Sequence, residues 1–345
     1  MSCLENLQNQ KSIDIYGEKM DKINKILLVA IPMTICNLKC RYCYLTKRDN
    51  LCVGKQIKYG FSPEDFAKAV SKERLGGIAY ANFCADGETL LAKDIDKYIY
   101  AYLSCGHYAE IVTNMTVTKI LDKILEWDDE TLSRVSFKCS FHYLQLKERG
   151  LLDAFANNVN KVWKRGCSAS IEITPDDELI PYIEEVKEFS MRHFGALPHL
   201  TIARDDKNGR DYLTSLSIEE YDKIWSQFDS SFWQFKKSIF NVKRTEYCYA
   251  GKWSLYLDLA TGDTKQCYCG TNGVQNIVKC PKKPINFVAI GDCKDFHCYN
   301  GHALLTLGLI PGITDTKYGN IRDRVREDGT HWLQPKMLSF LSAYF

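Results

Sequence analysis

Residues 26–43 read ILLVAIPMTICNLKCRYC, and they decide the fold that the sequence predicts. The apolar run at 26–31 predicts a buried strand. The thiols of Cys36, Cys40 and Cys43 follow it at C-x-x-x-C-x-x-C spacing, so the strand delivers them onto a tight loop at its carboxyl end. Thiolates are soft ligands that suit iron–sulfur clusters and zinc. Three cysteines leave one iron of a four-iron cluster without a protein ligand, and that iron can bind a small molecule.

Strand and helix patterns alternate after this loop. We expect strands at 26–33, 78–83, 110–114, 134–141, 168–173 and 199–203, with helices at 63–74, 94–104, 116–127, 149–164, 176–194 and 217–228. Short links between them predict an α/β fold with a parallel sheet covered by helices. Six repeats fall short of a closed eight-fold barrel, which predicts an open, partial (β/α)6 barrel.

The expected domain organisation follows from this alternation and from the cysteines. A lead-in covers residues 1–24, the barrel 25–235, a small cysteine-rich C-terminal domain 236–330, and a C-terminal helix that packs on the core 331–345.

The composition excludes several classes of protein. The 345 residues carry a net charge of +2, which argues against nucleic acid as a partner. No apolar run approaches the roughly 18 residues of a membrane span. The polar N-terminus lacks the apolar centre of a signal peptide. We therefore expect a cytoplasmic protein without a membrane partner.

Fifteen cysteines are many for a chain of this length, and an odd number cannot pair completely in disulfides. Three lie within 36–43 and six between 248 and 298. This grouping indicates two metal-binding regions in a reducing compartment.

The first cysteine group, with Tyr42 directly before its third cysteine, resembles the motif of the radical S-adenosylmethionine (SAM) enzymes. The resemblance implies a [4Fe–4S] cluster whose open iron binds SAM. It also implies an external electron donor such as a flavodoxin or ferredoxin, and cleavage of SAM to a 5′-deoxyadenosyl radical that removes a substrate hydrogen. Zinc is the alternative, since C-x-x-C pairs are common in zinc sites, although the next thiol, Cys52, lies beyond a charged turn.

Further cofactor-binding candidates follow the expected strands, because ligands of parallel β/α folds lie at the carboxyl ends of the strands. Gly87 and Glu88 lie where the family shows Gly-Gly-Glu-Pro, but residues 85–89 here read ADGET. The resemblance implies that this segment meets the amino group of SAM; a simple turn is the alternative. Asn114 and Ser140 end the next two strands, where the family grips the ribose or carboxylate of SAM; capping or turn formation is the alternative.

Four residues are weaker candidates for contact with the substrate. His142 and Tyr143 lie just beyond the fourth expected strand. Glu172 lies inside the fifth among apolar neighbours, where a carboxylate needs a partner or a chemical role. Arg204 follows the sixth strand, and a solvated loop is its alternative explanation.

The second cysteine group flanks an expected hairpin at 253–259 with a turn at 261–263. It resembles the opening of the SPASM and twitch domains, which bind auxiliary [4Fe–4S] clusters, but the complete SPASM pattern is missing. The resemblance implies one auxiliary cluster on Cys248, Cys267, Cys293 and Cys298, and either Cys269 or Cys280 can replace one of these. Zinc is again the alternative.

Three functions are compatible with these features. The first is radical oxidation, epimerisation or dehydration of a carbohydrate-type small molecule, favoured by a lead-in too short for a leader-peptide domain and by a weak C-terminal resemblance to proteins of polysaccharide biosynthesis. The second is modification of a peptide or protein. The third is a non-enzymatic metal-binding scaffold, which predicts no cleavage of SAM.

Overall fold

A computed structural model describes residues 21–47, 54–205, 211–268, 275–295, 298, 306–307, 310 and 316–343. Most of the expected lead-in, together with Cys52 and Cys269, lies outside this part of the chain.

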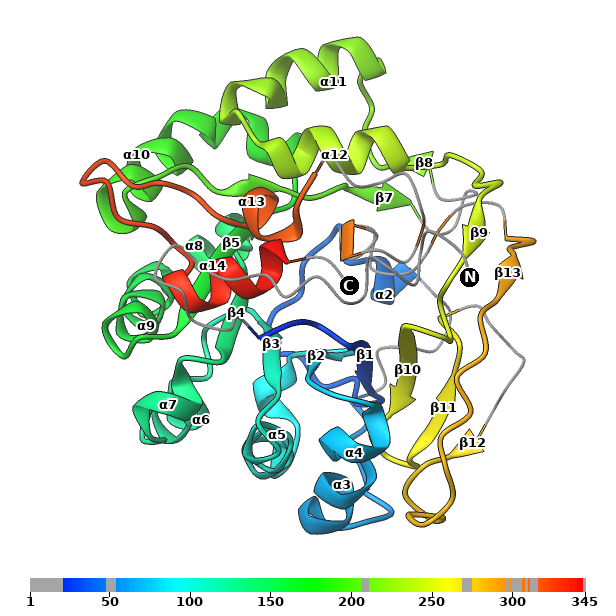
Figure 1. Cartoon of the computed structure of the whole chain (residues 1–345). Coiled ribbons are helices and arrows are strands. Elements are labelled where there is room, and N and C mark those ends of the chain that lie inside the picture. Colours follow the sequence, from blue (N-terminus) through cyan, green and yellow to red (C-terminus); the bar gives the residue numbers. More distant parts are fainter. Residues whose placement is uncertain are drawn as a thin grey trace.

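Six parallel strands in sequence order form one side of a nine-stranded sheet, from β1 to the edge strand β6 (Figure 1). They are β1 (Lys25–Ile31), β2 (Ala79–Ala85), β3 (Tyr108–Thr113), β4 (Val135–Ser140), β5 (Ser168–Ile173) and β6 (His199–Leu200). Every neighbouring pair among them is parallel. The predicted partial (β/α)6 barrel is confirmed, because the strands alternate with helices and the sheet does not close on itself.

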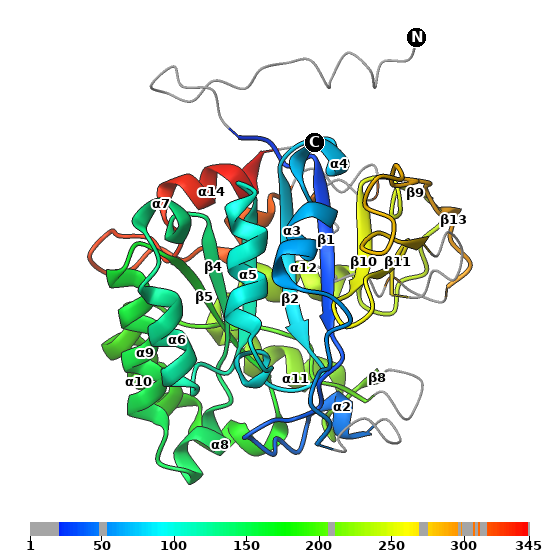
Figure 2. The same ribbon diagram turned by 90° about the horizontal axis from the view of Figure 1, so that it is seen from below.

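Helices cover the outer face of this sheet (Figure 2). They include α3 (Pro63–Ala69), α4 (Lys72–Leu75), α5 (Ile95–Ser104), α6 (Thr118–Leu125), α7 (Asp129–Leu132), α8 (Tyr143–Glu148), α9 (Leu152–Lys164) and α10 (Ile183–Phe194). The start of α3 is typical: the Ser62 side chain accepts a hydrogen bond from the amide of Asp65, and Pro63 occupies the first turn.

The two faces of the strands differ in polarity. Leu27, Phe83 and Phe137 point outward and belong to the main hydrophobic core with the helices. The inner face carries charged side chains, including Glu110, Lys138 and Glu172, at alternate positions of β3, β4 and β5. The inner face therefore combines these charged side chains with a second hydrophobic cluster, in which Ile26, Leu28, Tyr80 and Tyr108 pack against the C-terminal helices.

The sheet continues beyond β1 through residues that the sequence assigns to the C-terminal domain. Strand β10 (Ser254–Asp258) pairs parallel with β1. It also pairs antiparallel with β11 (Asp263–Lys265), which confirms the expected hairpin, and β12 (Gln275–Asn276) follows. The short strands β9 (Tyr247–Cys248) and β13 (Gly291–Asp292) pair separately. The sequence predicts the hairpin but not its pairing with β1.

The C-terminal helices lie inside the curve of the sheet (Figure 1). They are α12 (Ser231–Ile239), α13 (Tyr318–Arg322) and α14 (Pro335–Ser342); α11 (Ile218–Trp225) precedes them. The ring of Phe340 on α14 stacks on that of Tyr108 with centroids 3.7 Å apart, so the expected C-terminal helix packs on the core. No described helix is both long and apolar enough to cross a bilayer.

Candidate functional site

The three thiols of the cysteine loop (residues 32–43) lie close together after β1. Cys40 is buried, Cys43 is half-buried and Cys36 is exposed. Burial, and after it the charges of the nearby Cys43 and Cys36 thiols, raise the pKa of Cys40 to about 12. A bound metal reverses this effect, because its positive charge stabilises thiolates. Among the described residues, no group of three His, Cys, Asp or Glu side chains is arranged to hold a metal ion, so the cluster on Cys36, Cys40 and Cys43 stays a prediction.

The segment after β2 contacts the backbone of the cysteine loop. The amide of Glu88 donates to the carbonyl of Ile35, 2.9 Å away. A Cβ atom on Gly87 would lie 2.3 Å from that same carbonyl oxygen. Only glycine permits this close approach of two backbones. Gly87 therefore sets the position of the residue immediately before Cys36.

The carboxylate of Glu88 joins the ends of β2 and β3. It is 3% exposed and accepts hydrogen bonds from Thr113 Oγ1 (2.6 Å), the amide of Asn114 (2.7 Å) and the amide of Leu90 (3.0 Å). Burial raises its pKa. The expected contact between this segment and the amino group of SAM stays a prediction, and the side chain already has partners within the protein.

Asn114 ties the end of β3 to the cysteine loop. Its Nδ2 donates to Asn37 Oδ1 at 2.9 Å, and Nδ2 of Asn37 donates to Thr116 Oγ1 at 2.7 Å. Asn114 Oδ1 accepts from the hydroxyl of Thr116 at 2.6 Å. The position of Asn37 between Cys36 and Cys40 is the feature of the sequence that places it at this site.

Contacts from β4 hold the other side of the loop. The hydroxyl of Tyr42 lies within hydrogen-bonding distance, 2.8 Å, of Nδ1 of His142. Burial lowers the pKa of His142 to about 4, which keeps the imidazole neutral near pH 7. The amide of Lys39 donates to Gln145 Oε1 on α8 at 2.9 Å. His142 therefore belongs to the site through Tyr42.

An ion pair beyond β5 completes the attachment. Arg41 donates two hydrogen bonds to the buried carboxylate of Asp176, at 2.6 and 3.1 Å. Sequence reasoning missed this pair because 135 positions separate its members. The loop is thus fixed at the carboxyl ends of β2, β3, β4 and β5.

Two candidates near β4 have different surroundings. Tyr143 is 1% exposed, and its hydroxyl donates to Glu185 on α10 at 2.5 Å. Its ring packs edge-on against Phe141 in the core. Ser140 ends β4 on the inner face, opposite Glu172 in the parallel register. The roles expected for these residues stay predictions; the structure places Ser140, and not the Tyr143 hydroxyl, on the inner side.

Glu172 has charged partners inside the barrel. It pairs with Arg322 of α13 and with Lys138 Nζ of β4, the latter at 3.2 Å. Glu110 of β3 faces Arg322 at 4.0 Å and accepts a hydrogen bond from the Tyr318 hydroxyl at 3.0 Å. The partner that the sequence required for Glu172 thus comes from the C-terminal segment.

Arg204 lies beside the cysteine loop. It belongs to β7 (Arg204–Asp205), which pairs with β8 (Asp211–Tyr212). Its guanidinium stacks over the ring of Tyr44 at 4.1 Å from the centroid. Tyr44 begins α2 (Tyr44–Lys47), one residue after Cys43. The structure brings Arg204 to the site.

Solved structures share this arrangement of strands and helices. SuiB from Streptococcus suis, bound to S-adenosylmethionine, matches with a TM-score of 0.52 at 14% identity over 75% of this chain and 64% of SuiB. Native anSMEcpe with bound AdoMet matches with a TM-score of 0.51 at 15% identity over 75% of this chain and 80% of its own. Both are radical SAM enzymes. This chain has the radical SAM fold. No family model and no curated protein matches the sequence.

The chain spans 64% of the length of SuiB. In the radical SAM fold that it shares, the cysteine loop, Gly87–Glu88 and Asn114 all lie at the carboxyl edge of the barrel strands. This is the edge at which parallel β/α folds bind their ligands.

The second cysteine group is only partly assembled in the described residues. Cys248, Cys267 and Cys293 pack together around Ala250. Burial raises the pKa of Cys248, as do the nearby thiols of Cys293 and Cys267. Cys298 packs instead against the hydrophobic cluster inside the barrel, and Cys280 is exposed. The four-cysteine ligand set stays a prediction, with three members together.

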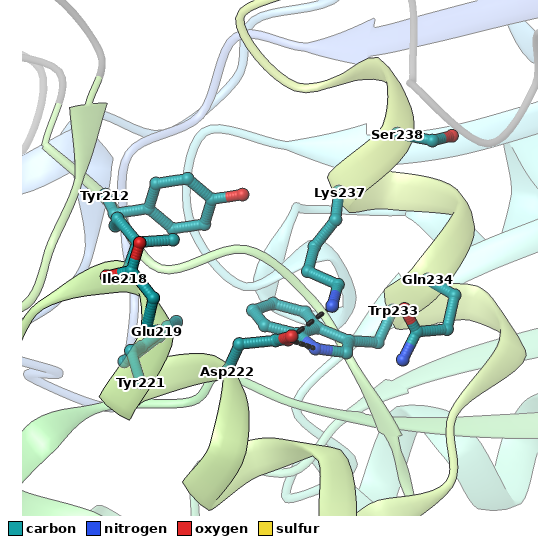
Figure 3. Close-up of a pocket in the computed structure, with 9 residues that line it drawn as sticks. All are labelled: Tyr212, Ile218, Glu219, Tyr221, Asp222, Trp233, Gln234, Lys237 and Ser238. Atoms are coloured by element: carbon teal, nitrogen blue, oxygen red, sulfur yellow. Dashed lines mark hydrogen bonds and ion pairs between the residues drawn. The ribbon is translucent and has the colours of Figure 1, made fainter.

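A surface pocket of about 490 Å³ lies apart from the cysteines, between α11 and α12 (Figure 3). Asp222 on its floor accepts a hydrogen bond from the Trp233 indole at 3.2 Å and pairs with Lys237. The positive charge of Lys237 in this pocket is therefore already paired.

Proposed function

We propose that this chain is a radical SAM enzyme that binds a [4Fe–4S] cluster on Cys36, Cys40 and Cys43. The observation that carries the proposal is a three-thiol loop fixed to four successive strand ends in a barrel with the radical SAM fold. A cluster on three cysteines retains one iron for SAM. When bound, it supplies the electron that cleaves SAM to methionine and the 5′-deoxyadenosyl radical.

The residues around the loop then have defined tasks. Gly87 permits close contact between its backbone and that of Ile35. Three side chains of the loop then fix its orientation by contacts with the barrel. These contacts are Asn37 with Asn114, Tyr42 with His142, and Arg41 with Asp176. The neutral imidazole of His142 adds no positive charge beside the thiolates. Rigid attachment of this kind is what positions a reactive group within a fraction of an ångström.

We propose a peptide or protein as the substrate. The solved structures that support this choice, SuiB and anSMEcpe, are peptide-modifying enzymes, and the comparisons give the carbohydrate-type substrate no support. A flavodoxin or ferredoxin is the proposed electron donor. We also propose a cytoplasmic location, because thiolate ligands of a cluster persist in a reducing compartment.

An auxiliary cluster is a further part of the proposal. Three thiolates for it come from separate strands. Cys248 ends β9, Cys267 follows the β10–β11 hairpin, and Cys293 follows β13. We propose Cys269 for the fourth position, because Cys298 packs against the hydrophobic cluster inside the barrel. A second cluster can accept the electron left on a substrate radical, or bind the substrate.

Anaerobic reconstitution tests the proposed function. With two clusters we expect about eight irons per chain and formation of 5′-deoxyadenosine from SAM with dithionite. Replacing Cys36, Cys40 and Cys43 together by Ala should remove about half of the iron and all nucleoside formation. The control replaces Cys105, which follows α5, and Cys167, which precedes the amino end of β5, and it should retain both the iron and nucleoside formation.

Two results would contradict the proposal. SAM cleavage by the first triple variant would refute the assignment of the cluster to this loop. Zinc in place of iron, with no cleavage of SAM by the native chain, would favour a metal-binding scaffold.

A further inference from the structure

Several cationic side chains of the described residues lie close together inside the barrel. Four cationic side chains gather there from four elements: Lys138 on β4, Arg204 on β7, Lys236 on α12 and Arg322 on α13. Among the described carboxylates, Glu172 pairs with Arg322 and Lys138, and Glu110 faces Arg322.

Lys236 is the cation whose position needs an explanation. It is 8% exposed, and its Nζ donates to Thr201 Oγ1 at 2.5 Å. Its ammonium also lies over the ring of Phe232, one helical turn earlier, at 4.8 Å. Within the described residues, Lys236 has these two neutral partners and no ion pair.

The ammonium of Lys236 lies near the level of the cysteine loop. Thr201 directly follows β6, and its amide donates to the carbonyl of Ile173 at the end of β5. Arg204, three residues later, stacks on Tyr44 beside Cys43. Arg204 is therefore close enough to Lys236 to affect its charge and also contacts the helix that follows the cysteine loop.

Burying an ammonium group without a counter-ion is unfavourable. Burial lowers the pKa of Lys236 well below its ordinary value, and the charges of Lys138 and Arg204 lower it further. Burial also lowers the pKa of Lys138 to about 8. Buried ionisable groups with shifted pKa values commonly lie in binding or catalytic sites, where an anionic ligand can act as the counter-ion of a lysine.

We propose that Lys236, together with Lys138 and Arg204, binds a carboxylate of the substrate. This inference rests on the proposed function and narrows it: the peptide presents an acidic side chain or its C-terminal carboxylate to the barrel interior. The pocket of Figure 3 is not part of this site, because its Lys237 is paired with Asp222.

Binding of small peptides to the reconstituted protein with SAM present tests the proposal. The probes are acetyl-Gly-Asp-Gly-amide, acetyl-Gly-Asn-Gly-amide and acetyl-Gly-Gly-Gly with a free carboxylate, each measured by titration calorimetry. We expect the Asp or the free-carboxylate peptide to bind at least tenfold more tightly than the Asn peptide. Lys236→Met should abolish this preference. Lys237→Met, at the neighbouring position that pairs with Asp222, should preserve it.

Thermal unfolding of the same variants separates a binding role from a structural one. Lys236→Met should unfold at a higher temperature than the native chain, because it removes an unpaired buried charge. A lower unfolding temperature would show that the ammonium stabilises the fold and would overturn the proposal. Lys236→Gln is a second variant, and it should also lose the preference for the peptides that carry a carboxylate.

Two further outcomes distinguish the sources of the carboxylate. If Lys236→Met weakens SAM binding as much as it weakens peptide binding, the cations serve the carboxylate of SAM and the proposal fails. Equal binding of the acidic and neutral peptides by the native chain also overturns it. If the protein cleaves no SAM but the peptide preference depends on Lys236, the proposed function fails while this inference stands.

Discussion

Asn37 lies between the first two cysteines of the loop, and its side chain contacts two residues that follow β3. It accepts from Asn114 and donates to Thr116. Each such hydrogen bond contributes about 1 kcal/mol net, and more when its loss leaves a buried partner unpaired. Because Asn37 moves with the cysteines, these bonds act directly on the geometry of the thiols.

Asn37→Ala should therefore lower the iron content after reconstitution and slow SAM cleavage by about tenfold or more, while the free energy of unfolding falls by only about 1–2 kcal/mol. Iron analysis and nucleoside assays measure the first two effects, and urea unfolding measures the third. Asn160→Ala is the matched control, since Asn160 also makes two side-chain hydrogen bonds, but on α9. Equal iron content in both variants would contradict the role of Asn37.

Gly87 illustrates a backbone contact that depends on the absence of a side chain. In Gly87→Ala the new Cβ would lie 2.3 Å from the Ile35 carbonyl oxygen, so the cysteine loop must shift. We expect a marked loss of bound iron, measured per folded protein. Gly150→Ala is the control: its φ of 63° makes alanine unfavourable by about 1 kcal/mol, but nothing lies within 4 Å. Iron loss in both variants would show that stability, and not the loop contact, governs iron binding.

At the scale of elements, one arginine connects the C-terminal segment to the barrel. Arg322 on α13 is 1% exposed and pairs with Glu172 of β5. Breaking a buried pair leaves an uncompensated charge, whereas removing both partners does not. The interaction between α13 and the sheet therefore depends on both members of the pair.

Arg322→Met should lower the free energy of unfolding by about 3–5 kcal/mol. The double variant with Glu172→Gln should be more stable than the sum of the two single changes predicts, which a double-mutant cycle of urea unfolding measures. Arg165→Met is the control, because its pair with Asp129 is exposed and such pairs contribute at most about 1 kcal/mol. Additive effects of the Arg322 and Glu172 changes would contradict a direct pair.

At the scale of the whole molecule, two fully buried histidines make the fold sensitive to acid. Burial lowers the pKa of His107 to about 4 and that of His199 to about 3. In the unfolded chain a histidine has a pKa of about 6.5. The unfolded chain therefore binds more protons below pH 6.5, and stability falls as the pH decreases towards the folded pKa values.

Each of these histidines should remove up to about 1.4 kcal/mol per pH unit below pH 6.5. Urea unfolding at pH 7, 6 and 5 measures this slope. His107→Gln should reduce the slope by the share of one histidine, whatever it does to stability at pH 7. A native chain equally stable at pH 7 and pH 5 would contradict the prediction.

Much of the fold and part of the site were predictable because their signals are local. The strand 168–173 coincides with β5, and the helix start at Ser62 and Pro63 was found, since periodicity and caps lie within a few residues. Helix α12 was missed: the pattern at 231–239 is mixed because one of its inward positions is Lys236. The anchors Arg41 and Asp176 were missed because distant pairs leave no local pattern.

The sequence by itself determined the repeated strands and helices, the three-thiol loop after β1 and its place at the carboxyl edge of a parallel sheet. These follow from hydrophobic periodicity and residue spacing, which act over short stretches of chain. Only the tertiary structure decided that β10 pairs with β1, that Arg322 reaches Glu172, and that Lys236 lies among other cations inside the barrel. These contacts join residues far apart in the chain, and their partners are fixed only when the elements pack.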